Sequence, residues 1–128
     1  MKNVQKLVSQ IGEVLGKLVS FNNSLKLYHW HVTGPGSYAQ HMALDQAIDD
    51  LTETLDSLAE TSYALVGDVK IVVPETTVPT DIIKHVEECY NYITSPDRGL
   101  FTESFAESLL DDYQQTIQQL LYRLKRLQ

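Results

Sequence analysis

Residues 29–45, HWHVTGPGSYAQHMALD, contain the sharpest break in the sequence. A glycine, a proline and a second glycine stand at positions 34–36, and such residues end helices and favour turns. Ser37 has the residue type of an N-cap and Gln40 follows three positions later, which predicts a capping box. Apolar residues recur at three- and four-residue steps on both sides of the break. The stretch therefore predicts two long helices joined by a tight turn.

The same periodicity, followed outward, predicts four helices. The first runs from about Val4 to about His31, and the second runs from Tyr38 to about Val66. A third, shorter helix follows Thr80 after the connection. A turn then leads to a fourth helix, which Thr102 is expected to cap.

A long connection separates the second and third predicted helices. Residues 67–79 hold two prolines and a β-branched run at 71–73, which disfavour a helix and allow a short extended piece. Two long helices, a crossover and two more helices are the topology of ferritin-like bundles. We therefore expect an all-α, ferritin-like four-helix bundle with a long crossover between the second and third helices, in which residues 1–128 form one domain.

Composition and charge limit the possible functions. The 128 residues carry a formal net charge of −7, and Cys89 is the only cysteine. Basic residues gather at 123–126, where cations suit the end of a helix, so we do not expect nucleic-acid binding. No apolar run has the length of a membrane span or the form of a signal peptide. We expect a cytoplasmic protein without a membrane partner, with a buried, inert Cys89 thiol.

Five residues with metal-binding side chains fall at related positions: His29, His41, Asp45, Asp56 and Glu60. On the predicted second helix, His41 and Asp45 are four residues apart, and so are Asp56 and Glu60. The two pairs are about three helical turns apart, so all four side chains share one helix face. They border the apolar stripe, where unpaired carboxylates are seldom found. Any one of these residues alone is more often a solvated or core-satisfied side chain. Together they predict a metal site.

One chain cannot close this site alone. Asp45 and Asp56 are eleven residues apart, which is roughly 16 Å along a helix, whereas metal–ligand bonds are about 2.0–2.2 Å long. If two copies of the second helix pack antiparallel about a two-fold axis, residues whose numbers add to 101 face each other. This condition joins Asp45 to Asp56, and it also joins His41 to Glu60. A hairpin turning at the break places His29 beside His41, so the spacing predicts two sites per dimer.

The donor set favours iron. Imidazole with carboxylate suits Fe(II), Mn(II) or Zn(II), and the lack of a thiolate argues against structural zinc. Carboxylates also neutralise the charge gained when Fe(II) becomes Fe(III). His31 and His85 do not fit the pairing, so we expect them to be exposed or to support the site from outside. Trp30 and Tyr28 are expected to be core or interface aromatics.

These residues resemble the Dps miniferritins. The run from His29 to Pro35, HWHVTGP, is similar to that family's His-Trp-Asn-Val-x-Gly pattern. The step from His41 to Asp45 is similar to the family's His-x-x-x-Asp step. Residues 56–60, DSLAE, are similar to its Asp-x-x-Ala-Glu step at the same separation. The resemblance covers about residues 20–67 and reaches the last helix only by pattern.

The resemblance implies a homo-oligomeric shell of twelve subunits that oxidises Fe(II) with hydrogen peroxide or oxygen and stores the ferric iron. Such a shell would act in oxidative stress. The implied ferroxidase ligands, which are also the catalytic residues, are His29, His41 and Asp45 of one subunit with Asp56 and Glu60 of its two-fold mate. Iron is thus the implied metal, and a second copy of the chain is the implied partner.

The chain also departs from the miniferritin pattern. His31 replaces an asparagine, Thr61 replaces an arginine, the third helix is shorter, and no Lys-rich tail is present. Residues 25–30, LKLYHW, resemble a run in short ferritin-like proteins of bacteriophages. The alternative hypothesis is therefore a non-catalytic ferritin-like assembly or virion-associated structural protein.

Overall fold

The described part of the chain is built from helices. The computed structural model describes residues 2–127, which contain four α-helices, one short 3₁₀ helix and no β-strand. Their bounds are α1 (Lys2–His31), α2 (Ser37–Val66), α3 (Ile82–Ile93), η1 (Pro96–Leu100) and α4 (Ser104–Arg126). The predicted all-α class and its four helices are confirmed. None of the helices in residues 2–127 combines the length and the apolar character that crossing a bilayer requires.

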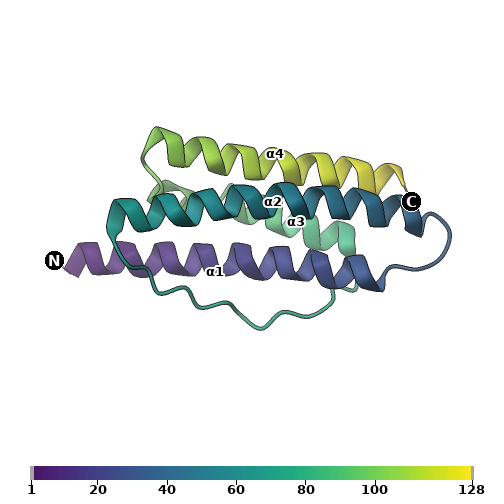
Figure 1. Cartoon of the computed structure of the whole chain (residues 1–128), viewed down its shortest axis with the longest axis horizontal. Coiled ribbons are helices and arrows are strands. Elements are labelled where there is room, and N and C mark those ends of the chain that lie inside the picture. Colours follow the sequence, from purple (N-terminus) through teal and green to yellow (C-terminus); the bar gives the residue numbers. More distant parts are fainter. Residues whose placement is uncertain (1, 128) are drawn as a thin grey trace.

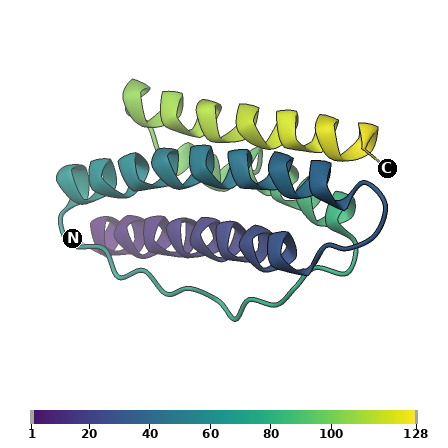
Figure 2. The ribbon, with the colours of Figure 1, turned by 45° about the vertical axis from the view of Figure 1, so that its right-hand side comes forward.

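The long helices lie side by side as in a four-helix bundle. α2 packs against both α1 and α4, and α3 packs against α4. Figure 1 shows α1 running toward the turn at residues 32–36 and α2 returning antiparallel beside it. α4 runs in the direction of α1 on the other side of α2, and the turned view in Figure 2 keeps this order. The α1–α2 hairpin thus brings residues 29–45 together at one end of the bundle.

The core is filled by the apolar stripes that the periodicity predicted. On α2, Leu44, Leu51 and Leu58 have no exposed surface, and burying one such side chain contributes about 1.5–3 kcal/mol. The apolar periodicity also predicts core positions at Val4, Leu65 and Phe105, and these predictions are wrong. The three residues lie near helix ends and are 58%, 48% and 52% exposed. The other helices supply the remaining fully buried side chains, which include Leu15, Leu25, Val86, Tyr113, Ile117 and Leu120.

A polar pair crosses this core. The Tyr113 hydroxyl of α4 donates to Oδ1 of Asn22 in α1 at 2.6 Å, and both residues are buried. Ser24 donates its hydroxyl to the Phe21 carbonyl at 2.6 Å. Since a buried polar group is tolerated when it is hydrogen-bonded, these bonds explain why a polar patch interrupts the apolar stripe of α1.

The helix starts differ from the predicted capping. Gly36, with a φ of 77°, stands at the N-cap of α2, and no side chain caps that end. Ser37 is the first helical residue, and its backbone N–H donates to the Gly34 carbonyl at 3.0 Å. The predicted capping box is therefore wrong, because the left-handed glycine turns the chain directly into the helix. Thr102 does not cap α4 either, since Glu103 holds that position without a side-chain hydrogen bond.

The connection between α2 and α3, residues 67–81, runs along α1. The carbonyl oxygens of Lys70 and Val72 come closer to Gly12 and Gly16, respectively, than any Cβ at these positions would allow. Only glycine lets a backbone approach a helix in this way. Both ribbon views show the connection passing lengthwise beside α1. In both views the connection is drawn out along α1, and its described residues form no paired strand.

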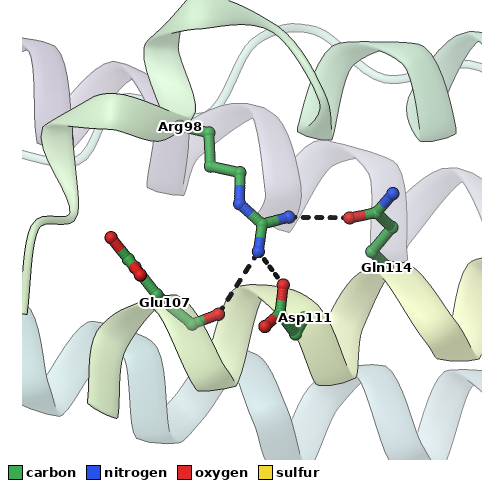
Figure 3. A network of polar contacts seen from close by, with 4 residues as sticks. All are labelled: Arg98, Glu107, Asp111 and Gln114. Carbon is green, nitrogen blue, oxygen red and sulfur yellow. Dashed lines mark hydrogen bonds and ion pairs between the residues drawn. The ribbon is translucent and has the colours of Figure 1, made fainter. Parts of the chain in front are cut away.

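One arginine fixes the segment between α3 and α4. The Arg98 guanidinium in η1 donates to Oε1 of Gln114 at 2.7 Å and to the Glu107 carbonyl at 3.4 Å. It also pairs with the Asp111 carboxylate. Figure 3 shows these contacts converging on one side chain. The predicted turn at this place is thus a short helix held on the surface of α4.

Candidate metal centre

The α1–α2 hairpin stacks two imidazole rings. The ring centroids of His29 and His41 are 3.6 Å apart, and the rings are inclined by 26°. Nδ1 of His41 lies 3.2 Å from the His29 carbonyl oxygen. Because a carbonyl only accepts, Nδ1 carries a proton, and in the neutral ring the lone pair is on Nε2. The predicted neighbourhood of His29 and His41 is confirmed, whereas their role as ligands stays a prediction.

The His29 ring is buried without hydrogen bonds. The residue is 6% exposed, and neither ring nitrogen has a hydrogen-bond partner in the described part of the chain. Nε2 lies 3.5 Å from Oδ1 of Asp45, which is too long for a strong hydrogen bond. An unpaired buried polar group costs about 1–3 kcal/mol. A bound cation at the unprotonated nitrogen would remove much of this cost.

Electrostatics keep the His29 ring neutral. Burial lowers the pKa of His29, and the neighbouring His41 and Lys26 lower it further, while Asp45 acts in the opposite direction. A neutral imidazole is the form that binds metals. The Asp45 side chain is 46% exposed. It therefore sits at the edge of the buried ring, where it meets both His29 and solvent.

The structure places Asp56 and Glu60 far from this trio within one chain. Both side chains are exposed on α2, and eleven residues separate Asp56 from Asp45. That separation is roughly 16 Å along the helix axis. Asp56 is nevertheless on nearly the same face of α2 as Asp45, because eleven residues are about three full turns. The helix therefore presents two separate donor pairs on one exposed face.

The trio does not by itself form a metal cage. Among the described residues, no group of three or more His, Cys, Asp or Glu side chains is arranged to hold a metal ion. His31 beside the trio is exposed, as expected. Trp30 is 68% exposed with the Lys26 ammonium 5.7 Å from its ring centroid. The expectation of a core tryptophan is thus wrong, and that of an interface tryptophan stays a prediction.

The surroundings of His85 were not predictable from the pairing of the metal-binding residues. Its ring stacks on Phe21 with 5.3 Å between centroids, and its Nε2 lies 2.7 Å from the Ser24 hydroxyl. Since that hydroxyl already donates to a carbonyl, Nε2–H of His85 is the donor. These residues and Cys89 line a cavity of about 230 Å³ between α1, α3 and the connection. The four-residue spacing of His85 and Cys89 was the available signal for this shared face.

The predicted burial of Cys89 is confirmed. The thiol is free and 7% exposed, and burial raises its pKa well above the ordinary value near 9. A thiol held in its protonated form is a poor nucleophile and a poor metal ligand. Cys89 therefore packs as a small apolar side chain.

Comparison with known proteins gives a family without a described activity. No curated protein and no solved structure shows significant similarity to the chain. The model of a protein family described as "Family of unknown function (DUF5856)" matches residues 29–124. The match begins at His29 and covers the complete α2, α3 and η1 and nearly all of α4. The chain therefore belongs to the DUF5856 family.

Proposed function

We propose that the protein is a ferritin-like ferroxidase that binds Fe(II) as substrate at sites shared by two subunits and stores the ferric product. The observation that carries this proposal is the buried His29 ring, which has no hydrogen bond within the described part of the chain and faces His41 and Asp45. A carboxylate and two imidazoles are a ligand set suited to Fe(II). In this proposal, the long connection beside α1 serves as the crossover of a ferritin-like bundle.

A second copy of the chain completes each site in this proposal. When α2 packs against α2 of another copy about a two-fold axis, Asp56 and Glu60 approach Asp45 and His41 of the partner. Exposed apolar side chains next to the site support such an interface, since large exposed apolar residues mark interaction surfaces. They are Trp30, Tyr38, Met42 and Tyr122, of which Tyr38 is 76% exposed.

The proposed chemistry assigns one role to each ligand type. The imidazoles of His29 and His41 hold iron as neutral terminal ligands, because both rings keep a lone pair. The carboxylates of Asp45, Asp56 and Glu60 would also bind iron, and their negative charge would offset the positive charge gained on oxidation. Two Fe(II) ions each lose one electron. One hydrogen peroxide takes up these electrons and two protons, its O–O bond breaks, and two waters form; dioxygen is the other candidate oxidant.

The larger assembly follows from the same family resemblance. In this proposal, two-fold dimers build a hollow shell, with twelve subunits as in the miniferritins, and acidic inner surfaces collect Fe(III). The net charge of −7 suits an interior that attracts cations. In this proposal the protein works in the cytoplasm, and its net charge of −7 disfavours nucleic-acid binding.

Complementation between two inactive variants tests the shared site. Asp45→Ala and Asp56→Ala each remove one ligand from every site of a homodimer. In a mixed dimer, one site lacks both carboxylates, but the other contains only unchanged residues. Removal of a ligand should lower the oxidation rate by at least the factor of about 10–100 seen for outer-shell metal-site residues. Co-expressed mixed dimers should regain a large part of the wild-type rate.

The control for this test is a mixture of Asp45→Ala with His41→Ala. Both changes fall on the same half of each site, so every mixed dimer has one ligand missing from each site and no intact one. Equal activity of the two mixtures would overturn the shared site. Full activity of the Asp56→Ala homodimer would remove Asp56 from the ligand set.

A further inference from the structure

The connection between α2 and α3 contains a stretch of extended chain that is open to solvent. Val72 and Val73 are 63% and 42% exposed. In the described residues, no hydrogen bond reaches the backbone of residues 70–73. β-branched residues in an extended chain with free N–H and C=O groups have the properties of an unpaired strand edge.

The contacts with α1 decide which edge is open. The carbonyls of Lys70 and Val72 point at Gly12 and Gly16, one helical turn apart. In an extended chain, the N–H and C=O of one residue point to one side and those of the next residue point to the other. The outward edge therefore carries the backbone groups of the odd-numbered residues.

The outward edge is free over a short length only. The Val69 carbonyl, which alternation places on this edge, already accepts a hydrogen bond from the Tyr63 hydroxyl at 2.8 Å. The next outward groups belong to Ile71 and Val73, and Pro74 follows them. Hence two residues, Ile71 and Val73, offer a complete set of donors and acceptors.

This edge is complementary to itself. In an antiparallel pair, residues that exchange both hydrogen bonds must each present their outward groups. If the two-fold axis passes through Val72, Ile71 of each copy stands opposite Val73 of the other. Pro74, which lacks an N–H, then stands opposite Lys70, where no hydrogen bond across the pair is needed. The pairing thus uses the free backbone groups of Ile71 and Val73, and Pro74 occupies a position where no N–H is needed.

We propose that a second copy of this chain pairs with the connection, antiparallel and with Val72 on the two-fold axis. The pairing covers the open edge of the connection in both copies. Each copy uses the same surface, as in an isologous dimer. It resembles the addition of a strand to an exposed edge, in which main-chain hydrogen bonds supply the affinity and side chains supply the specificity.

The location of this contact agrees with the dimer proposed for the metal centre. Stacking of His29 on His41 shows that α1 and α2 residues whose numbers add to about 70 are neighbours, so Gly16 lies near residue 54 of α2. The proposed α2–α2 axis passes beside Leu51, within about one helical turn of that level. The strand pairing needs no iron chemistry, and its test is therefore separate from that of the ferroxidase.

A cysteine at the axis tests the pairing. Directly opposed residues without mutual hydrogen bonds have Cα atoms about 4.5 Å apart, within the span of about 4.4–6.8 Å that disulfides accept. Oxidation of Val72→Cys should convert the monomer band on a non-reducing gel into a covalent dimer. Wild type, whose only cysteine is the buried Cys89, and Val78→Cys, an exposed site further along the connection, should remain monomeric on the same gel.

Amide hydrogen exchange gives a second, independent measurement. At a protein concentration that favours the dimer, the amides of Ile71 and Val73 should become protected, whereas the Val72 amide should not, because it faces α1. This alternation distinguishes strand pairing from simple coverage by any partner. The proposal is overturned if Val72→Cys stays monomeric or cross-links no faster than Val78→Cys. Protection that lacks the alternation, or that appears only with another protein, also overturns it. Cross-linking together with absent iron oxidation would refute the ferroxidase and leave this pairing standing.

Discussion

At the scale of single residues, the unusual feature is a buried imidazole without hydrogen bonds. His29 could be predicted as a neighbour of His41, since both positions follow from a hairpin at a Gly-Pro-Gly break. That its ring nitrogens find no hydrogen-bond partner among the described residues could not be predicted, because that depends on where the side chains around the turn at residues 32–36 point. The same limit applies to Trp30, because its exposure depends on the packing of the side chains around it.

His85 shows a second kind of limit. It does not fit the pairing of the metal-binding residues, yet it stacks on Phe21 and donates to Ser24. Both contacts come from α1, some sixty residues earlier in the chain, and no local pattern predicts them. Burial lowers the pKa of His85, although Glu88 opposes the shift.

A pH-dependent loss of stability follows from this pKa. In the unfolded chain His85 titrates near its ordinary value of 6.5, and in the folded chain it titrates lower. The unfolded state therefore binds more protons as the pH falls through that range, and the folded state loses stability there. Urea unfolding from about pH 7.5 to about pH 5.5 should show a larger decrease in the free energy of unfolding for wild type than for His85→Gln.

The glutamine variant is chosen because it keeps a donor for Ser24 and removes the titration. Other groups that titrate in this range, His29 among them, are present in both proteins and cancel in the comparison. Equal pH dependence of wild type and His85→Gln would show that the His85 ring is already free to become protonated in the folded state.

At the scale of elements, the long connection has a sequence signal that the periodicity did not use. Gly12 and Gly16 lie four residues apart on a face of α1 that is not part of the apolar stripe. Such a pair creates a shallow path for a backbone, and the connection follows it. The four helices themselves were predictable from their apolar periodicity. Their first residues were not, because backbone conformation at Gly36 rather than a side-chain cap starts α2.

The fit of the connection on α1 predicts a large effect of one methyl group. In Gly16→Ala the new Cβ would collide with the carbonyl of Val72, which is backbone and cannot move aside cheaply. We expect a loss of about 1–3 kcal/mol in the free energy of unfolding, the usual cost of overpacking. Denaturant unfolding measures it directly. In the matched variant Gly99→Ala, the Cβ meets nothing within 4 Å, and stability should change little.

An unchanged unfolding midpoint for Gly16→Ala would contradict the close approach of the connection. Because the strand pairing depends on this approach to define the open edge, the same variant should also weaken the cross-link at position 72. The two effects together connect the packing of α1 with the proposed interface.

At the scale of the whole molecule, the chain presents its donors in two halves. His29, His41 and Asp45 meet at one end of the α1–α2 hairpin, and Asp56 and Glu60 lie three turns along α2. The sequence predicted this division through helix geometry alone. What spacing cannot provide is the position of a second copy, because intersubunit contacts depend on surface shape and on exposed groups such as those of the connection.

If the two proposed contacts belong to one dimer, they must share its two-fold axis. α2 pairing would complete the metal sites, and pairing of the connection would cover the exposed Val72 and Val73. Exposed aromatic side chains near the hairpin, Trp30 and Tyr38 among them, add to the surface available for burial. The DUF5856 family model matches residues 29–124, which include α2, the connection and these aromatic residues.

The most direct test of the ferroxidase is the rate of Fe(II) oxidation when hydrogen peroxide is added to anaerobic, iron-loaded protein, followed by ferric absorbance. A ferroxidase should oxidise Fe(II) much faster than buffer does and saturate at a fixed ratio of iron to subunit, with the ferric product remaining soluble. Loss of this activity in Asp56→Ala with an unchanged helical signal would place the chemistry at the shared site. Oxidation no faster than in buffer would contradict the ferroxidase and favour a non-catalytic ferritin-like assembly protein.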